Sequence, residues 1–157
     1  LKAFKIVTNK YNNVKLILIG YGTEHKNIIT FAKNLNIYNK IIIINKTDNP
    51  YSYMRISKLL ILTSIYEGFP NALVESLTIG TPVISTNMNS GASEILLNGK
   101  GGDLVKIGDY RSLSKKIISF LNSPKVLLQK TILAKKQLHR FSAITHSKIY
   151  TTIFEKL

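Results

Sequence analysis

Two glutamates, Glu67 and Glu75, lie on either side of a Gly-Phe-Pro turn. The apolar segment 59–62 before the turn predicts a strand, and residues 71–79 after it predict a helix. The first turn of such a helix presents free backbone N–H groups, which suit a diphosphate. Glu75, just inside the helix, can accept hydrogen bonds from vicinal hydroxyls such as those of a ribose. This arrangement predicts a site for a sugar nucleotide.

Three further motifs occur in a fixed order around this segment: Leu18-Ile19-Gly20-Tyr21-Gly22, Gly80-Thr81-Pro82-Val83-Ile84-Ser85-Thr86 and Ser90-Gly91-Ala92-Ser93-Glu94-Ile95-Leu96. Together with residues 67–75 they resemble the donor-binding half of retaining glycosyltransferases with the two-domain GT-B fold. The family in question is GT4, also called glycosyltransferase group 1. The resemblance extends over nearly the whole chain, so it is more specific than any single motif.

The resemblance implies transfer of a hexosyl-type group from a nucleoside-diphosphate sugar to a polysaccharide, lipopolysaccharide or glycolipid acceptor. Glu67 is similar to the family glutamate near the transferred sugar and is the expected catalytic residue. Glu75 is similar to the glutamate that holds the ribose hydroxyls. The expected donor-binding residues are Gly20, Gly22, Asn45, Lys46, Gly68, Phe69, Pro70, Asn71, Ala72, Leu73 and Glu75. A UDP-sugar is favoured over a GDP-sugar, and neither a cofactor nor a metal ion is expected.

The backbone N–H groups of residues 68–73 are expected to stabilise the charge that develops on the departing diphosphate, as an oxyanion hole does. The segment 45–47 occupies the position that frames the nucleobase in the family. Leu1-Lys2-Ala3-Phe4 resembles the helix that follows two basic residues of the family, so those cations are expected upstream of Leu1. The N-terminal acceptor domain is expected to be missing, and the isolated segment is therefore expected to be inactive.

Other functions remain open. The chain could be a noncatalytic nucleotide-binding module, or a decayed gene fragment that works only with a partner. A non-hydrolysing epimerase is less favoured, because the Gly68-Phe69-Pro70-Asn71 context is typical of transferases. A dinucleotide site is disfavoured, since its fingerprint requires a third glycine where this chain has His25. His25, His139 and His146 are expected to be surface or packing residues, and Glu94 a first-turn carboxylate.

Continuous apolar runs predict strands at 14–19, 41–44, 59–62 and 82–85, with a short additional strand at 103–105. Because these runs do not alternate with polar residues, they indicate a parallel sheet covered on both faces. The predicted fold class is therefore α/β, a doubly wound parallel sheet (Rossmann-like) that forms the C-terminal half of a GT-B fold. Residues 1–157 are expected to form a single nucleotide-sugar-binding domain, with a helical C-terminal portion at 109–157 and Ser142 as a helix N-cap.

Parallel strands bring their carboxyl ends to one edge of a sheet, where ligands bind. The loops expected at this edge are residues 20–22, 45–47, 63–70 and 86–91. Both glutamates are therefore expected beside the same rim.

The composition suits a folded domain, with 45% hydrophobic and 19% charged residues. The formal charge of +14 is dominated by lysine, which either reflects a compositional bias or attracts an anionic membrane surface carrying a lipid-linked acceptor. Nucleic acid is not an expected partner, because no arginine cluster or nucleic-acid motif occurs. No apolar run approaches the roughly 20 residues of a spanning helix. The expected location is cytoplasmic, peripheral at the inner face of the membrane.

Overall fold

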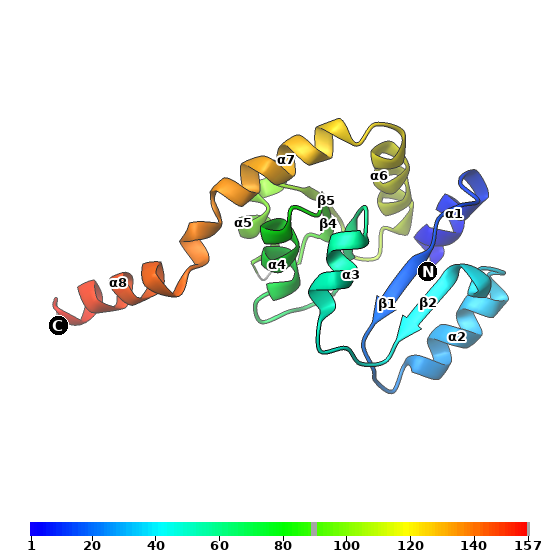
Figure 1. The fold of residues 1–157 in the computed structure, drawn as a ribbon, viewed down its shortest axis with the longest axis horizontal. Helices are drawn as coiled ribbons and strands as arrows, with labels where there is room; N and C mark the ends of the chain where they lie inside the picture. The colour runs from blue at the N-terminus through cyan, green and yellow to red at the C-terminus, as the bar shows by residue number, and fades with distance from the viewer. Residues whose placement is uncertain (89–90, 157) are drawn as a thin grey trace.

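A computed structural model describes residues 1–88 and 91–156 (Figure 1). The helices are α1 (Lys2–Lys10), α2 (His25–Asn34), α3 (Pro50–Ile56), α4 (Asn71–Ile79), α5 (Ala92–Ile95), α6 (Tyr110–Asn122), α7 (Lys125–Lys136) and α8 (Ala143–Phe154). Short 3-10 turns lie at Tyr38–Lys40, Leu97–Gly99 and Leu138–Phe141. The strands are β1 (Leu16–Ile19), β2 (Ile41–Ile44), β3 (Leu60–Leu62), β4 (Val83–Thr86) and β5 (Asp103–Val105). Strands and helices alternate as far as β5, and helices follow.

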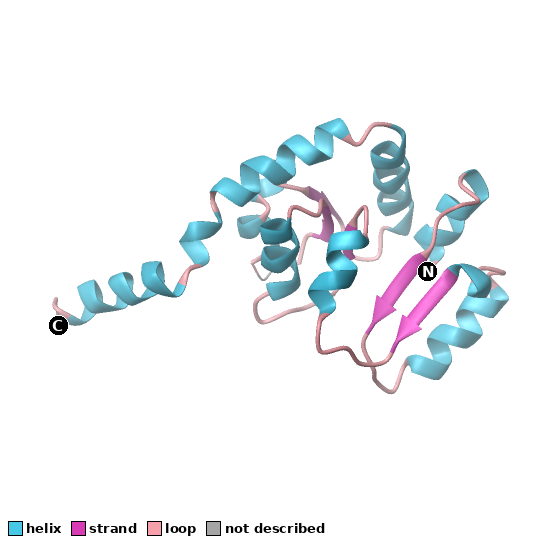
Figure 2. Ribbon diagram, viewed as in Figure 1, coloured by secondary structure: helices cyan, strands magenta, loops and turns pink. Residues whose placement is uncertain are grey.

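The described strands form two parallel sheets (Figure 2). In one sheet β1 pairs with β2, in the register Leu16 to Ile41. In the other, β4 lies between β3 and β5. All five predicted strands are present, with ends that differ from the prediction by two residues at most. The prediction of one continuous sheet differs from this arrangement, because no ladder joins β1 to β3 among the described residues.

Three apolar clusters hold the elements together. Residues of α1 and α6 cover one face of β4, while α4, α5 and α7 contribute to the cluster on the other face. A third cluster joins α1 to α2 and the β1–β2 sheet through Phe4, Ala32 and Ile37. The helices therefore cover both faces of the three-stranded sheet, as in a doubly wound fold.

Of the last two helices, α7 packs on this body and α8 extends away from it. Helix α7 is held by Lys130, whose ammonium group lies 2.6 Å from an oxygen of Asp103, and the other oxygen of Asp103 accepts from Lys116 of α6 at 3.3 Å. Helix α8 projects outward (Figure 1) and has no buried residue. Its predicted N-cap is confirmed, since Ser142 Oγ accepts a hydrogen bond from the Thr145 amide at 3.2 Å. None of the helices in residues 1–88 and 91–156 is both long and apolar enough to cross a membrane.

Candidate functional site

The turn between β3 and α4 holds Glu67 in a fixed position. Ser64, three residues earlier, donates its hydroxyl to Glu67 Oε1 at 2.6 Å. The Ser64 carbonyl in turn accepts from the hydroxyl of Thr86, at the end of β4, at 2.6 Å. Glu67 is half-buried. The side chain of the predicted catalytic residue is therefore tied, through Ser64, to the carboxyl end of the neighbouring strand.

The start of α4 offers fewer free N–H groups than residues 68–73 contain. Pro70 has no N–H, and the amides of Asn71 and Leu73 donate to the carbonyls of Phe69 and Pro70 at 2.8 and 2.9 Å. Leu73 is fully buried and anchors the helix in the core. Within the described part of the chain, the amides of Gly68, Phe69 and Ala72 have no backbone acceptor. These three amides are therefore available as donors to an anion at this turn.

Glu75 lies on α4 and faces the preceding helix, α3. The hydroxyl of Tyr51 lies 3.5 Å from Glu75 Oε1, at the outer limit of a hydrogen bond. Helix α3 was not among the predicted elements. It begins at the proline of an Asn-Pro pair: Asn49 caps the helix by accepting from the Ser52 amide at 3.2 Å, and Pro50 occupies the first turn. That pair is a helix-start signal that could have indicated α3, but not its contact with Glu75.

The loop after β4 packs on the same turn. Gly91 has φ +67°, and a Cβ at this position would lie 3.2 Å from Pro70 Cδ and 3.6 Å from the Phe69 ring. The Phe69 ring in turn lies 5.5 Å from that of Phe141, centroid to centroid. Gly91 is therefore needed both for its backbone conformation and for the close approach. Asn89 and Ser90, within the predicted loop 86–91, lie outside the described residues.

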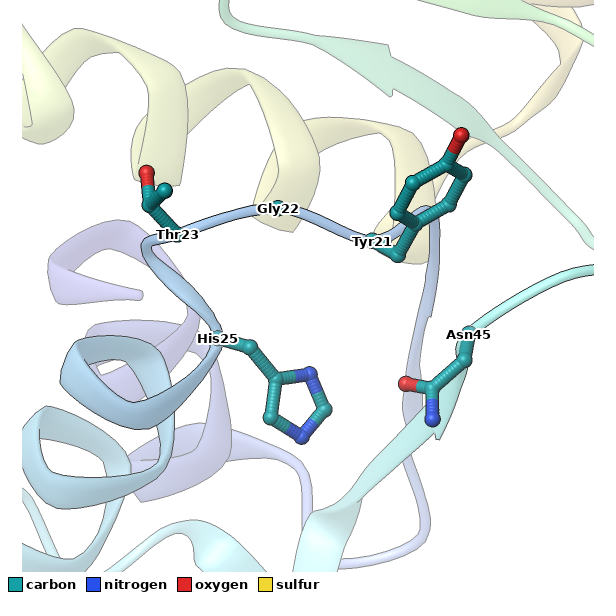
Figure 3. A pocket seen from close by; sticks show the side chains of 5 residues that line it. All are labelled: Tyr21, Gly22, Thr23, His25 and Asn45. Carbon is teal, nitrogen blue, oxygen red and sulfur yellow. The ribbon is translucent and has the colours of Figure 1, made fainter.

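A separate hollow lies at the carboxyl ends of β1 and β2 (Figure 3). It has a volume of about 550 Å³ and is lined by Tyr21, Gly22, Thr23, His25 and Asn45. The imidazole of His25 and the amide of Asn45 project toward it from opposite sides (Figure 3). Gly20, which opens the loop, has φ +144° while its N–H donates to the Ile44 carbonyl at 3.0 Å. Residues with a side chain rarely adopt such a positive φ, which explains why a glycine occupies position 20.

The predicted site residues thus fall into two groups. Gly22 and Asn45 line the hollow, with Gly20 and exposed Lys46 next to them in the chain, and residues 67–75 form the turn and the first part of α4. Helix α3 connects the groups, because it follows the segment 45–49 directly and reaches Glu75 through Tyr51. His25, Tyr21, Ser64 and Tyr51 belong to these groups but were not predicted as site residues. In the sequence, only the spacing of Ser64 three residues before Glu67 could have indicated such a role.

No group of three or more His, Asp or Glu side chains gathers as a metal site within residues 1–88 and 91–156. The groups that the structure gathers here are two carboxylates, backbone donors and a glycine-rich loop. Such a set can bind hydroxyls and an anion side by side.

Comparison with known proteins identifies relatives over most of the chain. Residues 1–137 match the family described as "Glycosyl transferases group 1". The chain is 30% identical over 114 residues (73% of it, 31% of the relative) to an N-acetylgalactosaminyltransferase of Campylobacter jejuni whose acceptor is a diphospho-undecaprenol-linked saccharide. Among solved structures, it aligns with TarM (TM-score 0.88, 21% identity, 98% of this chain and 31% of TarM). It also aligns with Anabaena HepE in complex with UDP (TM-score 0.86, 20% identity, 99% of this chain and 44% of HepE).

These alignments confirm the predicted α/β class with parallel strands and the likeness to one part of a GT-B structure. The chain spans between 24% and 36% of the length of the first three curated relatives. It therefore corresponds to a portion of those proteins.

Proposed function

The chain belongs to the glycosyl transferases group 1 family, and from that premise we propose that it is the donor-binding domain of a retaining, GT4-type glycosyltransferase. Its donor is a nucleoside-diphosphate sugar, with UDP favoured over GDP. The observation that carries this proposal is the juxtaposition of the anchored Glu67 with the three free amides at the start of α4.

Each part of the donor is assigned to the residues whose chemistry suits it. The diphosphate lies against the free amides of Gly68, Phe69 and Ala72, because these are the donors that the helix does not use itself. Glu75 accepts hydrogen bonds from the ribose hydroxyls, and Glu67 faces the transferred sugar. The nucleobase occupies the hollow between residues 20–25 and Asn45.

Stabilisation of the leaving group follows from this geometry. Cleavage of the glycosidic bond leaves negative charge on the diphosphate, and donors held in place before the reaction stabilise that charge without reorganising. Glu67 is fixed by Ser64, so it acts on the sugar from a set position. Neither glutamate needs to act as a general base in this assignment.

The acceptor is proposed from the relatives. The name of the C. jejuni relative specifies an undecaprenol-linked acceptor, and a second relative is a capsular polysaccharide biosynthesis glycosyltransferase of Staphylococcus aureus. A lipid-linked or polysaccharide acceptor and a cytoplasmic, membrane-peripheral location agree with the net charge of +14. The alternative function, a noncatalytic nucleotide-binding module that works with a partner, uses the same donor site but no acceptor.

Calorimetric titration of UDP, GDP and ADP tests the donor assignment. Glu75→Gln removes a charged acceptor, and loss of a charge-assisted hydrogen bond costs about 1.5–3 kcal/mol, or about 10- to 150-fold in affinity. Glu155→Gln, which makes the same charge change at the end of α8, serves as the matched control and should leave affinity unchanged. If Glu75→Gln binds all three nucleotides as the unsubstituted chain does, the ribose assignment is wrong.

A further inference from the structure

The side chain of Phe69 packs against two segments that come later in the chain. Its ring lies 5.5 Å from the ring of Phe141, centroid to centroid, in the tilted geometry that aromatic pairs favour. On its other contact it meets Gly91, where a Cβ would come within 3.6 Å of the ring. Through this ring, the turn between β3 and α4 rests on the loop after β4 and on the 3-10 turn Leu138–Phe141 that follows α7.

Phe141 is itself held by its neighbour, Arg140. The guanidinium carbon of Arg140 lies 4.9 Å from the centroid of the Phe141 ring. The same guanidinium donates to the carbonyl of Gln137 at 3.1 Å and to that of Glu94, in α5, at 3.3 Å. Because a guanidinium is planar and carries several N–H groups at fixed angles, it can stack on a ring and bond two carbonyls at once. Arg140 therefore fixes Phe141 relative to α5.

These contacts form a closed circuit around the turn. Phe69 contacts Phe141, which Arg140 covers. Arg140 bonds to α5 at its carboxyl end, and Gly91, the residue before α5, returns to Phe69. The neighbouring Gly68 has no side chain with which to restrain the backbone. The amide of Phe69, which has no backbone acceptor among the described residues, is thus oriented by contacts made at its side chain.

We propose that Phe141 and Arg140 are positioning residues for the donor, because they fix the N–H groups of Gly68 and Phe69 in the orientation that binds the diphosphate. Arg140 directs its donors to protein carbonyls, so it is assigned no contact with the donor itself. Groups that are ordered before a ligand arrives lose little freedom on binding and need not reorganise as charge develops. The inference rests on the proposed function, since it gives these contacts a role in binding the diphosphate.

Amide dynamics measured by NMR in the unliganded chain test the restraint. Phe141→Leu keeps an apolar side chain but removes the ring. In this variant the order parameters of the Gly68 and Phe69 N–H bonds should fall from about 0.85, typical of rigid backbone, to below about 0.6. Phe141→Tyr retains the ring and should retain the order. Leu138→Ala is the matched control, because Leu138 packs on the same apolar cluster from the same turn but carries no ring; it should leave both amides ordered.

Titrations with a diphosphate and with its nucleoside test the link to the donor. The probes are UDP with uridine, GDP with guanosine and ADP with adenosine, and the pair used is one whose diphosphate the unsubstituted chain binds. Phe141→Leu should weaken diphosphate binding by about two- to twelvefold, as expected for one aromatic pair, and leave nucleoside binding unchanged. Arg140→Lys should weaken it by about two- to fivefold, because lysine keeps the charge but cannot stack and bond both carbonyls.

Several outcomes would overturn the proposal. Unchanged order or unchanged diphosphate affinity in Phe141→Leu, or an equal loss in Leu138→Ala, would remove the role of Phe141. Full affinity in Arg140→Lys would show that only the charge of Arg140 matters. Equal losses for diphosphate and nucleoside would indicate a general loosening of the site. Urea unfolding checks that each variant is folded, and Arg140→Lys decides the matter if Phe141→Leu is not.

Failure of the proposed function has a different signature. In that case the unsubstituted chain binds none of the three diphosphates, and the positioning role falls with it. Binding by the unsubstituted chain, together with any of the outcomes above, would overturn the positioning role alone.

Discussion

At the scale of single residues, the candidate site is organised by side chains that hold other side chains. Ser64 donates to Glu67 and is itself held through its carbonyl by Thr86. A carboxylate on a turn would otherwise sample several rotamers, and ordering a Glu side chain costs up to about 2 kcal/mol of conformational entropy. Ser64 and Thr86 supply that ordering before a ligand arrives.

The first residue-scale prediction concerns Ser64. Ser64→Ala should weaken binding of UDP-glucose by about three- to tenfold, because a hydrogen bond worth about 0.5–1.5 kcal/mol no longer positions Glu67. Binding of UDP should change little, since Glu67 is assigned to the sugar and not to the nucleotide. Calorimetry with both ligands measures the difference. Thr78→Val removes a comparable hydroxyl from α4 and should affect neither; equal losses for UDP and UDP-glucose in Ser64→Ala would contradict the assignment.

Gly91 gives a second prediction. Gly91→Ala should lower the free energy of unfolding by about 1–2 kcal/mol for the left-handed conformation, plus a contribution from the contact with Pro70. Gly99→Ala is the matched variant, because Gly99 has φ +91° and no atom lies within 4 Å of the position that a Cβ would take there. Urea unfolding should show a larger loss for Gly91→Ala, and only that variant should weaken UDP binding. Identical losses would mean that the contact with Phe69 and Pro70 carries no energy.

At the scale of elements, side-chain caps fix the starts of α3, α6 and α8. Asp109 caps α6, and its side chain accepts from the Ser112 amide at 2.9 Å. Hydrogen bonds from Ser112 lower the pKa of Asp109 below its ordinary value of 3.8. A lowered pKa in the folded chain means that the carboxylate contributes stability above the ordinary pKa. That contribution is lost as the pH falls through the folded value.

Urea unfolding at several pH values checks this cap. Asp109→Ala should lower the urea concentration at the unfolding midpoint at pH 7. Asp109→Asn should lower it less, because Asn is also a good N-cap. The difference between the unsubstituted chain and Asp109→Asn should shrink as the pH falls below about 4. A difference that stays constant down to pH 2 would show that ionisation of Asp109 does not contribute.

Much of this element-scale organisation could be predicted from sequence. Helix α4 occupies residues 71–79 as predicted, because the turn before it and Gly80 after it mark its ends clearly. Helix α3 has no buried residue, so it left no apolar pattern to find. The division of the sheet could not be predicted, since continuous apolar runs indicate strands without indicating which strands pair. His25 was expected to be a surface or packing residue, and only the fold brings it opposite Asn45.

At the scale of the whole molecule, charge is the dominant property. With 22 basic and 8 acidic residues, the chain should bind vesicles of anionic lipid more strongly than neutral vesicles. Binding should weaken as salt rises from about 50 to 300 mM, because the Debye length shortens over that range. Vesicle co-sedimentation measures both effects. Equal binding to the two kinds of vesicle, or binding that salt does not change, would support compositional bias as the origin of the charge.

Helix α3 links the hollow at the ends of β1 and β2 to Glu75 on α4. At one end it continues from the segment beside the hollow, and Tyr51 in its first turn approaches Glu75. Near its other end, the Met54 carbonyl accepts from the Thr81 hydroxyl at 2.9 Å, so α3 contacts both the middle of α4 and the segment that follows it. In the proposed assignment, a base that shifts the segment 45–49 should also move Glu75, the carboxylate assigned to the ribose. The preference for one nucleobase would then include a coupling free energy between the base subsite and the ribose subsite. It would not be the sum of two independent contacts.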